Sequence, residues 1–226
     1  MSSVPFRGRP STGEGAPSWR LARVVRATLG RLLLAAYRTR FIGAENVPVS
    51  GAVLAGNHAS YLDPALLWCG APRPTHFVAK AELWELGWLG WLLDRFWAIP
   101  VERGSADRAM ISTATELLGR DELVGMFPEG TRGHGGSDEL GEAHGGVAFI
   151  AMRAGVPIVP VGIAGTDRAL PRGAKMPRLT KVVFSYGEPI HPDDFEGGRK
   201  ERIEAMTKEL MRRIRVERDR AREAAS

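Results

Sequence analysis

The chain has 226 residues with 44% hydrophobic and 25% charged side chains, a composition that suits a folded domain with a sizeable core. Its formal net charge is +5, and its single cysteine, Cys69, has no partner, which excludes a disulfide scaffold. The longest stretch without Asp, Glu, Lys or Arg, residues 46–62, is interrupted by polar residues, so no membrane-spanning helix is predicted. Because the first twenty residues lack the apolar run of a secretory signal, we expect a cytoplasmic protein.

The positive charge lies at the two ends of the chain. Residues 1–40 carry +7 and residues 199–226 carry +4, whereas the residues between them carry −6. A nucleic-acid-binding domain would carry its basic residues on the folded domain itself, so no nucleic-acid partner is expected. The basic ends suit anionic lipids on a membrane surface.

The N-terminal region divides into two parts. Residues 1–17, rich in Ser, Gly, Pro and Arg, are expected to form a disordered tail. Residues 18–39 are expected to form an amphipathic helix with Ser18 as its N-cap. Its predicted apolar face contains Val25, Leu29, Leu32 and Ala36, with arginines opposite. Two interpretations are open: the helix packs on the domain, or it lies in a membrane interface with its arginines on anionic headgroups.

Residues 40–226 alternate between short apolar runs and helical patterns, which predicts an α/β domain with a single mixed, largely parallel sheet flanked by helices. In such sheets, ligands bind beyond the C-terminal ends of the strands. The expected strands are 41–44, 52–56, 75–79, 97–101, 123–127, 157–163 and 181–186. The expected helices are 64–68, 82–94, 106–118, 146–154 and 199–222, and the last carries one apolar stripe.

The segment that follows the expected strand 52–56 reads Asn57-His58-Ala59-Ser60-Tyr61-Leu62-Asp63. In a loop, Asp63 can fold back onto His58, fix the tautomer of its ring and leave the other nitrogen as a general base. A loop histidine whose hydrogen bonds are simply satisfied is the alternative for this spacing.

A second motif, Phe127-Pro128-Glu129-Gly130-Thr131-Arg132, follows the expected strand 123–127. Glycine at this place allows positive φ or a close approach to a ligand. The fork of Arg132 suits a phosphate, and Glu129 can orient that arginine or hold a hydroxyl group. A tight turn with a surface ion pair is the alternative.

Together the two motifs closely resemble those of the lysophospholipid acyltransferase family, which includes 1-acylglycerol-3-phosphate acyltransferases. Asn57, His58 and Asp63 match its first motif, and residues 127–132 match a later one without a mismatch. A further motif centred on arginine is similar to residues 99–104, with Glu102 where aspartate is more usual, and the apolar, proline-containing segment 156–161 resembles the last. The resemblance covers about residues 20–215 and implies a glycerolipid acyltransferase-like fold.

The resemblance implies direct transfer of an acyl group, without a covalent enzyme intermediate, a metal or another cofactor. His58, oriented by Asp63, would deprotonate the free hydroxyl of a lysophospholipid, which then attacks the thioester of acyl-CoA or acyl-carrier protein. The acceptor most expected is 1-acylglycerol-3-phosphate, giving phosphatidate. Asn57, Ser60 or nearby backbone amides are candidates for stabilising the oxyanion. The expected acceptor-binding residues are Arg103, Glu129, Gly130, Thr131 and Arg132.

One departure from the family pattern concerns the acceptor's head group. Family members often carry Lys or Arg about a dozen residues after the second motif, where this chain has His144, a possible phosphate contact. Histidine is charged only part of the time near neutral pH. Acceptors such as acyl-amino-acid lipids therefore stay open, as does a membrane-surface lipid-binding protein without catalysis.

The segment 83–93 holds three tryptophans, Trp84, Trp88 and Trp91, spaced to share one face of a helix. Three interpretations are open for this face: core packing, contact with a membrane interface, or the wall of an acyl-chain channel. In the last case Gly87 and Gly90 would leave room for the alkyl chain.

Overall fold

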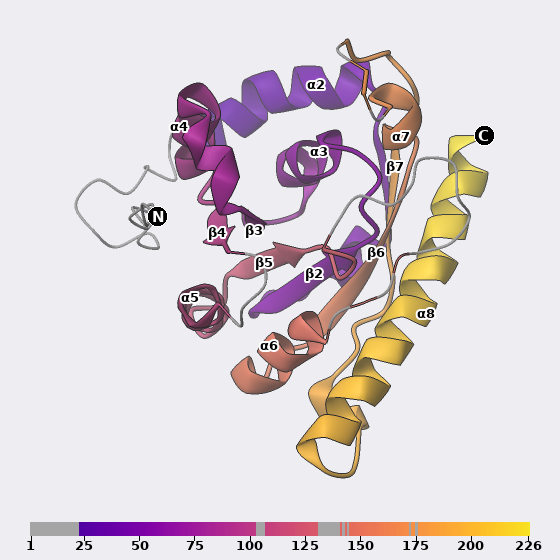
Figure 1. The fold of residues 1–226 in the computed structure, drawn as a ribbon. Helices are drawn as coiled ribbons and strands as arrows, with labels where there is room; N and C mark the ends of the chain where they lie inside the picture. The colour runs from indigo at the N-terminus through magenta and orange to yellow at the C-terminus, as the bar shows by residue number, and fades with distance from the viewer. Residues whose placement is uncertain are drawn as a thin grey trace.

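The computed structural model describes residues 23–102, 107–130, 141, 143, 145–171, 173–174 and 176–226, without the side chain of Arg95. The expected disordered tail and the N-cap Ser18 lie outside these residues. The described residues form a seven-stranded sheet with the order β1-β7-β6-β2-β5-β3-β4 (Figure 1). Its strands are β1 (Arg40–Ile42), β2 (Ala52–Gly56), β3 (Thr75–Lys80), β4 (Ile99–Val101), β5 (Leu123–Met126), β6 (Ile158–Ala164) and β7 (Val183–Tyr186).

The sheet is parallel at every pair of neighbouring strands except β6 and β7, which run antiparallel. The central strands β2 and β6 are buried along their whole length, because helices cover both faces of the sheet. This explains their nearly continuous apolar sequences. The predicted fold class, a mixed and largely parallel α/β sheet flanked by helices, is confirmed.

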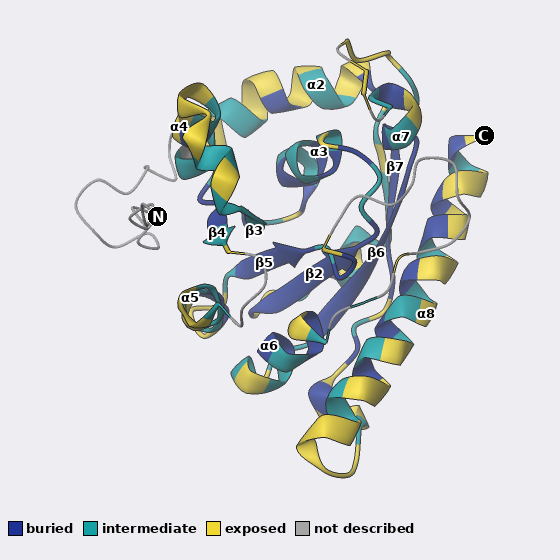
Figure 2. Ribbon diagram, in the orientation of Figure 1, coloured by how far each residue is buried: buried dark blue, intermediate teal, exposed yellow. Residues whose placement is uncertain are grey.

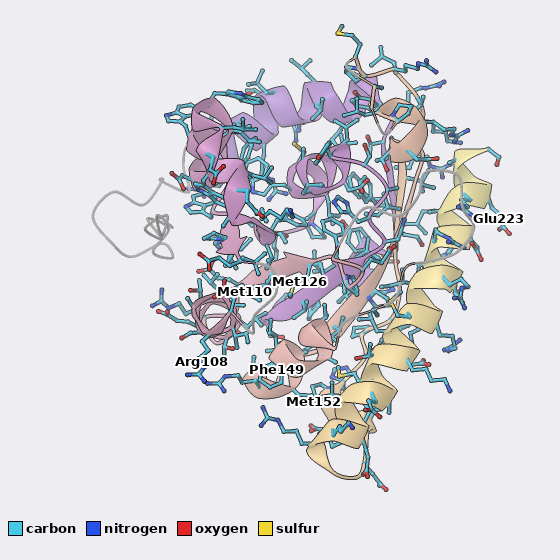
Figure 3. The ribbon with its side chains drawn as sticks, in the orientation of Figure 1. Arg108, Met110, Met126, Phe149, Met152 and Glu223 are labelled. Atoms are coloured by element: carbon cyan, nitrogen blue, oxygen red, sulfur yellow. The ribbon has the colours of Figure 1, made fainter. Side chains whose placement is uncertain are left out.

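The two faces of the sheet have separate apolar cores. Figures 1 and 2 show α3 (Leu62–Gly70) and α2 (Arg31–Ala36) over one face, with buried strands beneath them. The opposite face is covered by α5 (Arg108–Leu118), α6 (Gly146–Ala154) and α8 (Arg199–Ala225). The side chains of Met110, Phe149 and Met152 pack on the core of this second face (Figure 3).

Helix α8 packs along β6, and its predicted apolar stripe is confirmed because Met206, Leu210 and Ile214 are buried. The backbone of the helix comes very close to the strand at Gly162. A Cβ atom on Gly162 would lie 2.0 Å from the carbonyl carbon of Glu217. Glycine is therefore required at this crossing.

The prediction of one continuous helix over residues 82–94 is wrong at the centre of that range. The structure has a 3₁₀ helix, η3 (Ala81–Glu85), and a separate α4 (Gly87–Arg95), with extended backbone at Leu86 (φ −80°, ψ 89°) between them. The indole Nε1 of Trp84 donates to Asp94 Oδ1 at 2.8 Å, so Trp84 leaves the predicted common face. Trp88 and Trp91 are 73% and 56% exposed, which argues against core packing for these two.

The two glycines of this segment differ in their surroundings. A Cβ on Gly90 would lie 2.9 Å from the carbonyl oxygen of Trp84, so the backbone of η3 fills the space that was expected to admit an alkyl chain. Gly87 has no heavy atom within 4 Å of such a Cβ among the described residues. Gly90 thus serves the packing of η3 against α4.

The N-terminal helix contains a π-helical turn, η1 (Arg26–Gly30), before α2. The π turn contains one more residue than an α-helical turn, which shifts the side of the helix that faces the domain by one residue. The next residue on that side after Val25 is therefore Gly30, which is buried, and not Leu29. Leu29 and Leu32, predicted to share the apolar face with Val25, are 65% and 68% exposed. The predicted face is therefore divided between the core and the surface.

Arg26 fastens this helix to α3. Its guanidinium donates to the carbonyl of Ala71 and lies over the ring of Trp68, 5.7 Å from the centroid. Burial lowers the pKa of Arg26 from its ordinary value. The ring of Phe96, at the end of α4, contacts the same tryptophan at 4.4 Å between centroids. The N-terminal helix and the end of α4 therefore meet over Trp68.

Three short helices complete the described residues and were not predicted: η2 (Ala44–Asn46), α7 (Thr166–Ala169) and η4 (Pro192–Asp194). Each has only one turn, too short for a periodic pattern to show in the sequence. Within the described part of the chain, no helix combines the length and the apolar character needed to cross a bilayer.

Candidate active site

Two neighbouring parallel strands bring the two sequence motifs to one edge of the sheet. β2 and β5 pair with Ala55 opposite Met126, so the residues after each strand emerge side by side. The backbone N–H of His58 donates to Glu129 Oε1 at 3.2 Å and joins the two loops directly. The edge predicted to hold ligands is therefore where both motifs meet.

His58 and Asp63 form the pair predicted from their spacing. His58 Nδ1 lies 2.8 Å from Asp63 Oδ2, and the same oxygen accepts the backbone N–H groups of Ala59 at 2.7 Å and Ser60 at 2.8 Å. A carboxylate that accepts these bonds requires the hydrogen of the ring to be on Nδ1. In the neutral ring this tautomer leaves the lone pair on Nε2, as a general base requires.

The position of Asp63 follows from the start of α3. Asp63 lies in the first turn of this helix, where the partial positive charge of the N-terminus favours a carboxylate. Its side chain is fully buried, whereas that of His58 is 17% exposed. A buried, fixed carboxylate behind a partly exposed imidazole leaves the ring accessible to a substrate.

Phe127 supports the histidine ring from the second motif. The two rings stack with their centroids 4.2 Å apart and their planes 17° from parallel. No role was expected for Phe127, although an aromatic residue directly after a strand that ends at the site is a usable signal. The stacking limits rotation of the imidazole about its side-chain bonds.

Glu129 does not have the free carboxylate that acceptor binding was expected to use. Oε1 accepts the N–H of His58, and Oε2 accepts the N–H of Gly141 at 3.0 Å. The residue is buried. In this structure Glu129 holds two loops together and positions the backbone at His58. Gly130, also expected at the acceptor site, has φ +61° and forms the turn after Glu129.

The side chains of Asn57 and Ser60, candidates for stabilising the oxyanion or for supporting the site, form hydrogen bonds within the fold in this structure. Asn57 joins β2 to β6: its Nδ2 donates to the carbonyl of Ile163 at 3.0 Å and its Oδ1 accepts the N–H of Ile163 at 2.8 Å. Ser60 Oγ donates to the carbonyl of Leu170 at 3.1 Å. Both side chains hold the shape of the loop.

Four of the predicted site residues, Arg103, Thr131, Arg132 and His144, lie outside the described residues. Asp107 is the first described residue after Arg103. It is the N-cap of α5 and accepts the N–H of Met110 at 2.9 Å. It also accepts the N–H of Glu102 at 3.0 Å. In the described ranges, no group of three or more His, Cys, Asp or Glu side chains is arranged to hold a metal ion.

Comparisons with known proteins agree with this geometry. A family model described as Acyltransferase matches residues 38–164. A 1-acyl-sn-glycerol-3-phosphate acyltransferase of Bacillus subtilis (strain 168) is 36% identical over 174 residues, covering 76% of this chain and 83% of that protein. A lyso-ornithine lipid O-acyltransferase of Pseudomonas aeruginosa is 35% identical over 146 residues, covering 63% of this chain and 54% of that protein.

A solved structure shares the fold. The crystal structure of the 1-acyl-sn-glycerophosphate (LPA) acyltransferase PlsC from Thermotoga maritima matches with a TM-score of 0.68 and 25% identity, covering 86% of this chain and 78% of that one. The segment matched by the family model contains His58, Asp63 and Glu129, together with the strands that place them. The chain therefore belongs to the acyltransferase family.

Proposed function

We propose that this protein transfers a fatty acyl group from an acyl thioester to the free hydroxyl of a lysophospholipid, with 1-acyl-sn-glycerol-3-phosphate as acceptor and phosphatidate as product. The observation that carries the proposal is the His58–Asp63 pair at the ligand-binding edge of the sheet, in which the carboxylate on Nδ1 reserves Nε2 for the role of general base. The names of the Bacillus and Thermotoga relatives support the acceptor.

In the proposed reaction, His58 Nε2 takes the proton of the acceptor hydroxyl as the oxygen attacks the thioester carbonyl. The new ester C–O bond forms, the C–S bond breaks, and the imidazolium returns its proton to the departing thiolate. Asp63 stabilises the imidazolium between the two transfers. Holding both reactants beside the base adds to the acceleration, because it removes the entropy cost of their encounter.

The phosphate of the acceptor is proposed to bind Arg103, Thr131 and Arg132, with His144 as an additional contact. Guanidinium groups match phosphate oxygens in geometry and charge. The proposed chemistry needs no metal or cofactor beyond the acyl thioester, because the base and the phosphate-binding groups are side chains of the chain.

A panel of acyl donors and lysolipid acceptors tests which donor and which acceptor the protein uses. Purified protein is assayed for thiol release with acyl-CoA and with acyl-carrier protein, each crossed with lysophosphatidate, a lyso-ornithine lipid and other lysolipids. We expect the highest kcat/KM with lysophosphatidate. A preference for the lyso-ornithine lipid is the second candidate, which the Pseudomonas relative and His144 favour. Vesicle binding without turnover on any pair would instead favour a lipid-binding protein.

Glu129 provides a test of the positioning of the site. Replacing it with glutamine turns an amide N–H₂ toward one of the two backbone N–H groups that the carboxylate accepts, so one hydrogen bond is lost. We expect kcat to fall about tenfold, the effect of roughly 1.4 kcal/mol, while KM for the acceptor changes little. Steady-state kinetics measure both. Glu116→Gln, on the exposed side of α5, is the control; a rise in KM alone at Glu129→Gln would restore its expected role in acceptor binding.

We further propose that the protein binds the cytoplasmic face of the membrane as a peripheral protein. Four exposed apolar side chains, here called the apolar rim, lie on the two helices that meet over Trp68: Leu29, Leu32, Trp88 and Trp91. Exposed arginines flank them on the N-terminal helix, among them Arg31. Tryptophan beside basic residues is typical of helices that lie in an anionic interface.

The apolar rim predicts a measurable loss of membrane binding. We expect the double variant Trp88→Ser/Trp91→Ser to bind anionic phosphatidylglycerol vesicles about 10- to 100-fold more weakly in sedimentation, because two large apolar side chains no longer enter the bilayer. Val49→Ser, which changes an exposed apolar residue before β2, is the control. Equal binding by all three proteins would contradict the proposed surface. A further variant without residues 1–22 measures the share of the arginines that precede the described helix.

A further inference from the structure

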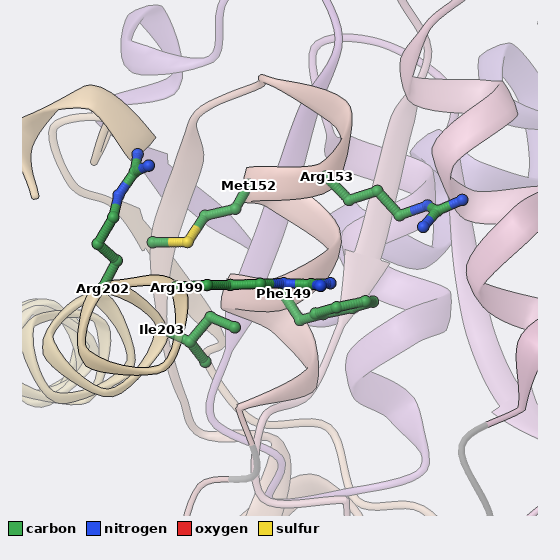
Figure 4. Close-up of a pocket in the computed structure, with 6 residues that line it drawn as sticks. All are labelled: Phe149, Met152, Arg153, Arg199, Arg202 and Ile203. Carbon is green, nitrogen blue, oxygen red and sulfur yellow. The ribbon is translucent and has the colours of Figure 1, made fainter. Parts of the chain in front are cut away.

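A pocket outside the site described above lies between α6 and the first turn of α8. Its volume is about 360 Å³, within the range of small-molecule sites. It lies on the side of the sheet that α5, α6 and α8 cover. The lining residues come from the two helices: Phe149, Met152, Arg153, Arg199, Arg202 and Ile203 (Figure 4).

The floor of the pocket is apolar and partly aromatic. Phe149, Met152 and Ile203 are half-buried against the core of this face. The guanidinium of Arg199 lies over the ring of Phe149, 4.8 Å from its centroid. A guanidinium that lies over a ring offers its outer face to a planar, electron-rich group.

The three arginines at the pocket have no acidic partner. In the described parts of the chain, no carboxylate lies within ion-pair distance of Arg153, Arg199 or Arg202. Arg202 donates from Nη2 to the carbonyl of Pro192 at 2.8 Å, but its buried Nε has no hydrogen-bond partner. Farther along α8, by contrast, Arg212 is paired with Glu209. Three unpaired guanidinium groups around one cavity attract an anion with more than one charged group.

The directions of the side chains indicate the shape of that anion. Figure 4 shows Arg202 and Arg153 extending to opposite sides of the pocket, with Arg199 and Phe149 between them. A nucleotide with phosphates on the 3′ and 5′ oxygens of its ribose combines a planar base with two separated anionic groups. We propose that this pocket binds the 3′-phosphoadenosine diphosphate end of a CoA thioester, the donor in the proposed acyl transfer, and the proposal rests on that function.

A short stretch of chain connects the site to the pocket. Gly141, whose N–H contacts Glu129, is four residues before Gly145, the N-cap of α6. Four residues span at most about 14 Å, and Phe149 lies about 6 Å farther along the helix, so at most about 20 Å separates the backbone of Gly141 from that of Phe149. The pantetheine chain has the length of roughly four to five extended residues, about 15 Å, before the diphosphate is added.

The test measures nucleotide binding separately from turnover. Calorimetry with 3′-phosphoadenosine 5′-phosphate, and KM for palmitoyl-CoA, are compared in wild type, Arg199→Gln and Arg153→Gln. We expect each variant to weaken nucleotide binding and to raise the KM for palmitoyl-CoA about tenfold, the effect of one charge-assisted hydrogen bond, with kcat little changed. Arg215→Gln makes the same charge change at an exposed position of α8 and should leave both values within twofold.

Three outcomes would overturn the proposal. The first is unchanged nucleotide affinity in both pocket variants, and the second is an equal loss in Arg215→Gln, which would show only a general effect of charge. The third is a rise in KM for acyl-carrier protein but not for palmitoyl-CoA, which would assign the pocket to a protein partner. If wild type transfers from neither donor, the proposed function fails, while the calorimetry still decides whether the pocket binds the nucleotide.

Discussion

We expect the His58→Ala variant to lose acyl transfer by a factor of about 10²–10⁴, the contribution of a positioned general base. Without the imidazole, no group in the described loop is placed to take the proton of the acceptor hydroxyl. Asp63 cannot replace it, because its side chain is fully buried and its Oδ2 is occupied by the N–H groups of Ala59 and Ser60. Thiol release from palmitoyl-CoA with lysophosphatidate measures the loss.

Asp63→Asn tests whether the two residues act as a unit. The amide keeps the volume of the carboxylate, but it no longer requires the ring hydrogen to be on Nδ1, and it does not stabilise an imidazolium. We expect a loss comparable to that of His58→Ala, and a double variant no slower than His58→Ala alone. Multiplicative losses in the double variant, with all three proteins folded by circular dichroism, would show that the residues act independently.

The second large effect is expected at Gly162, where α8 crosses β6. An alanine Cβ would lie 2.0 Å from the carbonyl carbon of Glu217 and 2.2 Å from the backbone nitrogen of Arg218. Because both atoms are backbone, the helix has to move as a whole from a strand that it covers. We expect the free energy of unfolding to fall by about 3 kcal/mol, the upper part of the usual range for overpacking.

For a chain of this size, that loss corresponds to a melting temperature about 6–12 °C lower in calorimetry or thermal circular dichroism. Gly146→Ala is the matched control, because a Cβ at Gly146 meets nothing within 4 Å in the described structure and the residue begins α6. A melting temperature of Gly162→Ala within 2 °C of the control would contradict the close crossing.

Much of the architecture could be predicted because it follows from local patterns. The apolar sequence of β2 and the helical period of α6 were predicted with the bounds that the structure has. The meeting of His58 with Asp63 also followed from the sequence, since both residues belong to one short loop after a buried strand. Parallel neighbouring strands then explain why Glu129 reaches the same edge.

What could not be predicted depends on partners outside the local sequence pattern. Glu129 was expected to bind a ligand, but its carboxylate accepts backbone N–H groups 71 and 12 residues away. Asn57 forms its hydrogen bonds with a residue 106 positions later. The break between η3 and α4 has a similar origin, since Trp84 turns toward Asp94. Residue types and spacing indicate which groups are present, but the fold decides which partners satisfy them.

The π-helical turn at Arg26–Gly30 has a consequence for the number of residues that the N-terminal helix needs in order to pack on α3. A π turn is equivalent to one inserted residue in an α-helix. If one residue were deleted within it, the regular period would carry the inner face from Val25 directly to the present Gly30 and then to Leu33. The same side chains would therefore contact α3 in a helix one residue shorter. We expect a deletion of one residue in this turn to keep the inner and outer surfaces of the helix unchanged.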